Sequence, residues 1–147
     1  MPYSAPATGG NTALYAEIQQ FYAHQMHLLD GGDADAWAQT FTPDGVFAAN
    51  AHPQPAVGRE TIRAAASKVK AQHAEEGLQV RHWLGMMDIT EQPDGSVLAR
   101  TYALIINTPR GGQAAVSLST TCDDLLVRDE NGAWLVADRK VVRDDLR

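Results

Sequence analysis

Cysteine is nearly absent from this sequence, because Cys122 is the only one among 147 residues. A single thiol forms no internal disulfide, no redox dithiol and no cysteine-rich zinc site. The opening residues also lack the basic start and apolar core of a secretory signal. We therefore expect a cytoplasmic protein.

Long apolar runs and an excess of positive charge are missing as well. No stretch reaches the roughly 18 consecutive apolar residues of a membrane-spanning helix. The formal net charge is −6, and the Lys and Arg residues are scattered along the chain. The missing apolar run predicts no membrane. Because phosphate backbones repel a negative protein, the sequence also predicts no nucleic-acid binding.

Signatures of cofactors and metals are also lacking. The chain has no nucleotide-binding motif. His24, His27 and Asp30 follow one another at steps of three. Each such step turns a helix by about 300°, so the first and last of these side chains diverge by roughly 120° and converge poorly on one ion. We predict no metal and no cofactor.

The residues that are present have the composition of one folded domain. Hydrophobic residues make up 44% of the chain and charged residues 20%, which is typical of a water-soluble globular protein. Residues 1–10 are rich in Pro, Ala, Gly and Ser and predict a flexible tail. Residues 11–147 then form a single domain.

Helical patterns fill the first half of the chain. Apolar residues recur at steps of three and four over residues 12–29, and Gly31 and Gly32 end that helix. Asp33 or Asp35 can cap a short second helix that carries Trp37 and Phe41. The remaining predicted elements are a turn at residues 42–45, a short strand at 46–50, a loop at 52–57 and a third helix at 59–74.

Strand patterns fill the second half. Four long runs rich in Val, Leu, Ile, Thr and aromatic residues cover residues 79–90, 96–108, 114–128 and 133–142. Turn signals at residues 92–95, 109–112 and 129–132 favour consecutive antiparallel hairpins. Strands of this length bend, so we predict an α+β fold in which helices cover the concave face of a curved sheet and enclose a pocket.

Several short motifs in this order resemble a known family. They are residues 41–47 (FTPDGVF), 57–62 (VGRETI), 80–85 (VRHWLG), 123–128 (DDLLVR) and 131–134 (NGAW). Over residues 12–142 the chain resembles the SnoaL-like branch of the nuclear transport factor two superfamily. This resemblance implies a cone-like antiparallel sheet packed against three N-terminal helices, and a homodimer.

His82 is the sharpest candidate for chemistry. It alternates with Val80, Leu84 and Met86, so these side chains are expected to share one face of a strand. A pocket histidine is a natural general acid or base, although it can also be a core or rim residue satisfied by one hydrogen bond. The resemblance to scytalone dehydratase, through the sequence His-Trp-Leu-Gly at residues 82–85, implies a catalytic role.

The same resemblance implies an aspartate partner at the end of the first helix. Asp30 or Asp33 fits this position, and we prefer Asp30 because it continues the apolar helix directly. Its carboxylate could fix the tautomer of His82 and stabilise the imidazolium form. The alternative is an exposed Asp30 that starts a loop.

Further candidates could bind the substrate. Leu29, Ala49 and Asn107 stand where scytalone dehydratase has two tyrosines and a second histidine, which puts dehydration itself in doubt. Asn107 could still hydrogen-bond a substrate, or be a polar strand end. Trp37, Phe47 and Met86 could line a pocket for a flat substrate, or be core residues.

Two sets of side chains alternate along residues 119–124. Ser119, Thr121 and Asp123 share one face, and Thr120, Cys122 and Asp124 share the other. The family's polyketide cyclases imply a carboxylate inside the cone, which is Asp123 or Asp124. We select Thr121 and Asp123 as the candidate substrate contacts.

The leading functional hypothesis is a cofactor-independent enzyme of secondary metabolism. It would cyclise, dehydrate or isomerise a hydrophobic, polyketide-like aromatic intermediate by proton transfer at His82 and Asp30. The alternatives are a non-catalytic binding or assembly module of the same fold and, third, an epoxide hydrolase with Arg100 near its centre.

Overall fold

The computed structural model describes residues 11–147, and the tail predicted over residues 1–10 lies outside them. The helices are α1 (Thr12–Asp30), α2 (Ala34–Ala38) and α3 (Arg59–Glu75), with a terminal 3₁₀ turn at Asp144–Leu146. The strands are β1 (Phe41–Ala49), β2 (Ala56–Val57), β3 (Leu78–Glu91), β4 (Val97–Pro109), β5 (Ala115–Arg128) and β6 (Trp134–Arg143).

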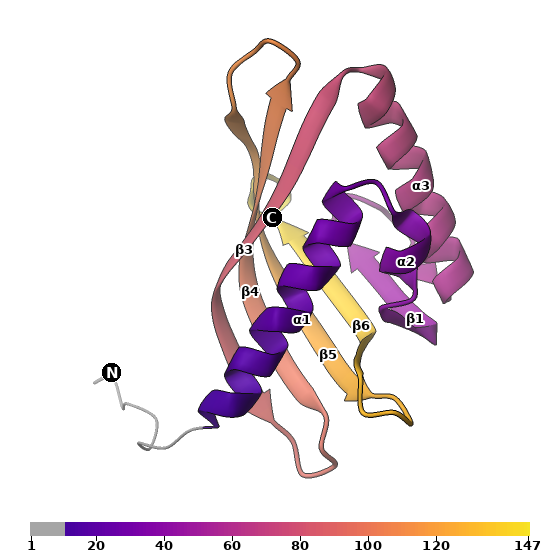
Figure 1. The fold of residues 1–147 in the computed structure, drawn as a ribbon, viewed down its shortest axis with the longest axis vertical. Helices are drawn as coiled ribbons and strands as arrows, with labels where there is room; N and C mark the ends of the chain where they lie inside the picture. Colours follow the sequence, from indigo (N-terminus) through magenta and orange to yellow (C-terminus); the bar gives the residue numbers. More distant parts are fainter. Residues whose placement is uncertain (1–10) are drawn as a thin grey trace.

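The six strands form one mixed sheet in the order β2-β1-β6-β5-β4-β3. The consecutive antiparallel hairpins predicted from the turn signals are confirmed for β3 to β6. β1, in contrast, runs parallel to β6. Figure 1 shows the long strands bending while α1 lies across them, with α2 and α3 beside β1. The predicted α+β fold of a cone-like sheet covered by three helices is confirmed.

The segment around Phe41 differs from the sequence expectation. Phe41 belongs to β1 and not to the second helix, and the expected turn at residues 42–45 lies within the same strand. Phe41 pairs with Val136 of β6, and the register shifts before Val46. A Cβ at Gly45 would lie 3.3 Å from the carbonyl oxygen of Val136. The glycine that suggested a turn therefore allows the backbones of β1 and β6 to approach closely.

The main core lies between the helices and the concave face of the sheet. Its fully buried side chains include Ile18, Phe41, Ile62, Val97 and Leu126. The outer face of β3, β4 and β5 instead carries exposed apolar residues, among them Trp83 and Tyr102, which are 67% and 61% exposed. Among residues 11–147, no helix is both long and apolar enough to cross a membrane.

Candidate functional site

The structure brings His82 and Asp30 into direct contact. Nδ1 of the His82 ring lies 2.6 Å from Oδ1 of Asp30, and the backbone N–H of His82 donates to Oδ2 at 3.0 Å. The Asp30 side chain is 7% exposed and the His82 side chain 24%. One buried carboxylate therefore holds both the ring and the backbone of the histidine.

The end of α1 directs Asp30 toward β3. Asp30 is the last residue of the helix, and Gly31 and Gly32 then turn the chain, with Gly32 at a φ of 86°. The side chain of Asp33 accepts a hydrogen bond from the backbone N–H of Ala36 at 3.0 Å and caps α2. Of the two aspartates considered, Asp30 contacts the histidine and Asp33 is occupied by the cap.

This arrangement determines which ring nitrogen of His82 can react. A carboxylate that accepts a hydrogen bond from Nδ1–H leaves the lone pair of the neutral ring on Nε2. Nε2 then accepts a proton from a ligand, and the adjacent negative charge stabilises the imidazolium that forms. The pair is chemically suited to general acid and base catalysis.

Asn107 lies on the same face of the sheet as His82. On β3, Val80 and His82 point to one side, and their partners on β4 are Asn107 and Ile105, so these four side chains share a face. Oδ1 of Asn107 is buried and has no hydrogen-bond partner among the described residues. An unpaired acceptor near the histidine could receive a ligand hydroxyl.

Met86 does not follow the expected alternation with His82. The register of β3 against β4 shifts between Gly85 and Asp88, which adds one residue to β3. Met86 sits in this bulge with a φ of 51° and is 77% exposed. A bulge reverses the facing of the residues that follow it, and so the neighbouring Met87 packs on the core instead.

Thr121 and Asp123 also lie away from His82, contrary to their selection as substrate contacts. Thr121 pairs with the exposed Tyr102 on the outer face of the sheet. Asp123 pairs with Arg100, and its side chain lies 3.4 Å from the Arg100 guanidinium in solvent. The opposite set, which includes Asp124, faces the helices.

Trp37 and Phe47 belong to an aromatic cluster in the core. The Trp37 ring packs edge-on against Phe41 at a centroid distance of 4.9 Å, and Phe47 lies 6.4 Å from it. Trp37 is buried, and Phe47 is partly buried against the same core. Their observed contacts are those of core residues, which was the alternative considered for them.

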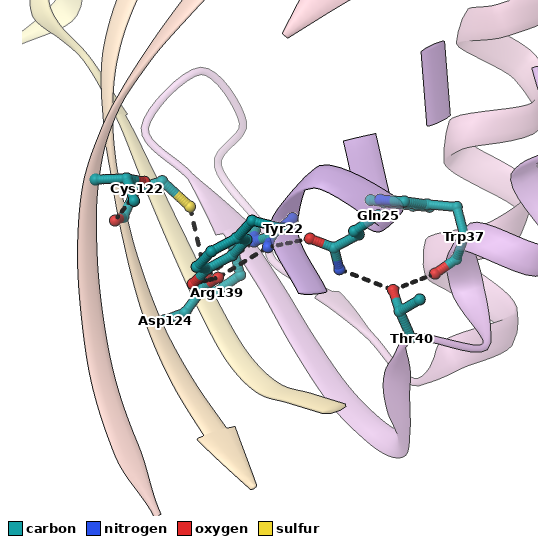
Figure 2. Close-up of polar contacts among 8 residues, drawn as sticks. Tyr22, Gln25, Trp37, Thr40, Cys122, Asp124 and Arg139 are labelled. Atoms are coloured by element: carbon teal, nitrogen blue, oxygen red, sulfur yellow. Dashed lines mark hydrogen bonds and ion pairs between the residues drawn. The ribbon is translucent and has the colours of Figure 1, made fainter. Parts of the chain in front are cut away.

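A buried polar network occupies the concave side, and Figure 2 shows its members together. Two guanidinium nitrogens of Arg139 each lie 2.8 Å from an oxygen of Asp124, and the Tyr22 hydroxyl donates to the same carboxylate at 2.6 Å. Arg139 also donates to Gln25, whose amide donates to the Thr40 hydroxyl. Both charges are thus fully paired.

Burial governs the ionisation of this network. It raises the pKa of Tyr22 well above the usual range, and the Asp124 carboxylate raises it further. Burial also raises the pKa of the Cys122 thiol to about 12. These two acids therefore stay protonated at neutral pH, and Tyr22 remains a hydrogen-bond donor to Asp124.

Sequence reasoning missed the role of Arg139. The register of β6 against β5 shifts after Leu125, so that Ala137 is an extra residue and Arg139, not Asp138, faces the helices. The apolar stripe of α1 did contain a signal, since Gln25 follows Ile18 and Tyr22 on the buried side. A glutamine in that position indicates a buried polar partner.

Comparison with known proteins identifies similar chains. The model of a family described as SnoaL-like domain matches residues 11–140. ActVI-ORFA from Streptomyces coelicolor is 34% identical, with a TM-score of 0.83 and a match covering 90% of this chain and 96% of that one. A Catenulispora acidiphila protein in complex with S-DNPA is 40% identical, with a TM-score of 0.80 and coverage of 92% and 96%.

A more distant structure shows the fold alone. It is an NTF2-like protein with a cystatin-like fold from Novosphingobium aromaticivorans, 23% identical, with a TM-score of 0.76 and coverage of 95% of this chain and 93% of that one. None of the curated proteins compared with the chain matches it.

Proposed function

This chain belongs to the SnoaL-like domain family, and on that premise we propose that it is a cofactor-independent acid/base enzyme. His82 is the residue that transfers the proton, and Asp30 is the residue that orients it. The contact between the Asp30 carboxylate and Nδ1 of His82 carries the proposal, because it leaves Nε2 as the reactive nitrogen.

The proposed reaction is the cyclisation, dehydration or isomerisation of a polyketide-like aromatic intermediate. Nε2 of His82 removes a proton next to a carbonyl group, and the same nitrogen returns a proton later in the cycle. The buried Asp30 carboxylate stabilises the charged ring between these steps. Asn107 is proposed to hold a substrate hydroxyl through its unpaired Oδ1.

The relatives support the binding of a small molecule. The Catenulispora acidiphila protein at 40% identity is in complex with S-DNPA, so this compound is the first ligand to test. Further candidates are aromatic polyketide intermediates that carry an acidic C–H beside a carbonyl group.

The proposal is tested by product formation from these compounds with His82→Ala. A positioned general acid or base contributes on the order of a hundredfold or more to the rate. We expect kcat to fall by that factor while the affinity for S-DNPA is retained. Asp30→Asn should also lower kcat more than it changes KM, because the amide removes the charge and disturbs the tautomer while leaving a similar volume.

His24→Ala is the matched control for this experiment. His24 is exposed on the same helix as Asp30, so its loss should leave the rate unchanged. Circular dichroism of every variant checks that it is folded. Equal rates for folded His82→Ala and the unchanged protein would contradict the catalytic role.

A non-catalytic binding module is the second candidate function, and the same pair of residues favours it. Because Asp30 bonds the backbone as well as the ring of His82, it also joins α1 to β3. In this case His82→Ala would lower stability, and S-DNPA would bind without being converted. The epoxide hydrolase hypothesis needs Arg100 at the centre of a catalytic site. Arg100 instead lies on the outer face of the sheet with its side chain 71% exposed.

The proposed assembly is a homodimer formed through the outer face of β3, β4 and β5. Trp83, Met86, Tyr102 and Val116 are exposed there. Contiguous apolar side chains on a sheet surface are typical of protein contacts. Pairing of two copies through this face would leave both concave sides open to substrate.

A further inference from the structure

A depression of about 490 Å³ lies beside the His82–Asp30 pair. The end of α1, the last two turns of α3 and the first residues of β3 surround it, and these three segments lie next to one another in Figure 1. Its polar lining consists of Asp30, Ser67, Lys70, His73 and Gln79. Asp30 therefore forms part of both this depression and the contact with His82.

Lys70 is the positively charged residue in the lining of the depression, and no ion pair of its ammonium group is found among residues 11–147. Burial lowers the pKa of Lys70, although the more distant Asp30 carboxylate opposes this effect. Both oxygens of Asp30 accept hydrogen bonds from His82. A partly desolvated ammonium without a partner favours an incoming anion.

His73 adds a polar group without adding charge. Its Nδ1 is buried and has no hydrogen-bond partner among the described residues. Burial lowers the pKa of His73, and the charge of Lys70 lowers it further, while Glu76 acts in the opposite direction. At neutral pH the ring is therefore neutral and can donate one hydrogen bond.

We propose that this depression is a subsite for a carboxylate group carried by the aromatic substrate. One ammonium and one neutral donor match a singly charged anion better than a doubly charged phosphate. The proposal rests on the proposed function, because it describes the substrate of the same site. It adds that Lys70 selects substrates by charge, while His82 carries out the proton transfer.

The test compares two probes of nearly equal shape, 2-naphthoate and 2-naphthamide, by calorimetric titration of the full chain at neutral pH. A charge-assisted contact should make naphthoate bind on the order of tenfold more tightly. Lys70→Gln should abolish this preference. Lys68→Gln, an exposed lysine of the same helix that does not line the depression, should retain it.

The possible outcomes separate this proposal from the enzymatic one. Equal affinity for the two probes, no binding of either at millimolar concentration, or a preference that survives Lys70→Gln would overturn the subsite. A preference that depends on Lys70 supports it even if no candidate substrate is converted. In that case the enzymatic role of His82 falls while the carboxylate subsite stands.

Discussion

At the scale of single residues, burial decides which of the neighbouring side chains can react. Asp123 and Asp124 are adjacent in sequence, yet the first lies in solvent beside Arg100 and the second is paired with Arg139 in the interior. Asp124 is therefore a structural carboxylate. His82 differs from both, since its ring is oriented by a buried partner and still partly accessible.

Cys122 gives a prediction at this scale. Its thiol is buried, and burial raises its pKa to about 12. Since the thiolate is the reactive form, iodoacetamide at pH 8 should leave the native protein unmodified and label it fully in guanidinium. The raised pKa also makes the stability depend on pH. Above about pH 9 the unfolded thiol loses its proton while the folded thiol keeps it, so the free energy of unfolding should decrease as the pH rises through about 9. Mass spectrometry measures the labelling, and rapid modification of folded protein would contradict the buried position.

At the scale of elements, bulges set which residues of the sheet face the helices. Each bulge adds one residue to a strand and reverses the alternation beyond it. The bulge in β3 turns Met86 outward, and the one in β6 turns Arg139 inward. A further register shift, between Ile105 and Ile106 of β4, adds a residue to β5 at Ser117. These shifts let long strands curve around the helices.

The network joining α1, β5 and β6 gives a prediction at this scale. Asp124→Ala would leave the Arg139 guanidinium buried without its counter-ion and remove the acceptor of the Tyr22 hydroxyl. We expect the free energy of unfolding to fall by about 3–5 kcal/mol. Asp123→Ala is the matched control on the same strand, and should change stability by less than about 1 kcal/mol because its ion pair is exposed. Urea unfolding measures both, and similar losses for the two variants would refute a structural role for the network.

At the scale of the whole molecule, the two faces of the sheet have different environments. The concave face packs on the helices and carries the buried network and His82. The convex face is left uncovered by residues 11–147 and carries exposed aromatic side chains. A sheet covered by helices on one face only offers its concave face for ligand binding and its convex face for assembly.

The proposed homodimer is tested by light scattering after size exclusion. The unchanged protein is expected at twice the chain mass of 15.9 kDa. The double change Trp83→Asp and Tyr102→Asp should shift it to the mass of one chain, since it places charges in the contact. Val57→Asp serves as the control, because Val57 is exposed on the distant strand β2. A monomer before any substitution would exclude the assembly.

Local patterns in the sequence determined the order of the three helices and the five longer strands, the antiparallel hairpins and the resemblance to the SnoaL-like family, which is confirmed. The short strand β2 (Ala56–Val57) was missed, because its residues were predicted to lie in a loop. Turn residues and side-chain periodicity act over a few positions, so they can be recognised without a structure. The family resemblance also implied Asp30 as the partner of His82, one at a helix end and one in an alternating strand.

Tertiary structure alone decided which side chains meet and which face they occupy. The contact between Asp30 and His82 joins residues 52 positions apart. Phe41 belongs to β1 because it pairs with Val136 of β6, although its local sequence resembles a helix followed by a turn. Thr121 and Asp123 keep the expected alternation, and the pairing of β5 with β4 places their set on the outer face. Met86 faces outward and Arg139 faces the interior because a one-residue shift in strand register exchanges the two faces of a sheet. That shift depends on how neighbouring strands pair, and the alternation within one strand does not contain it.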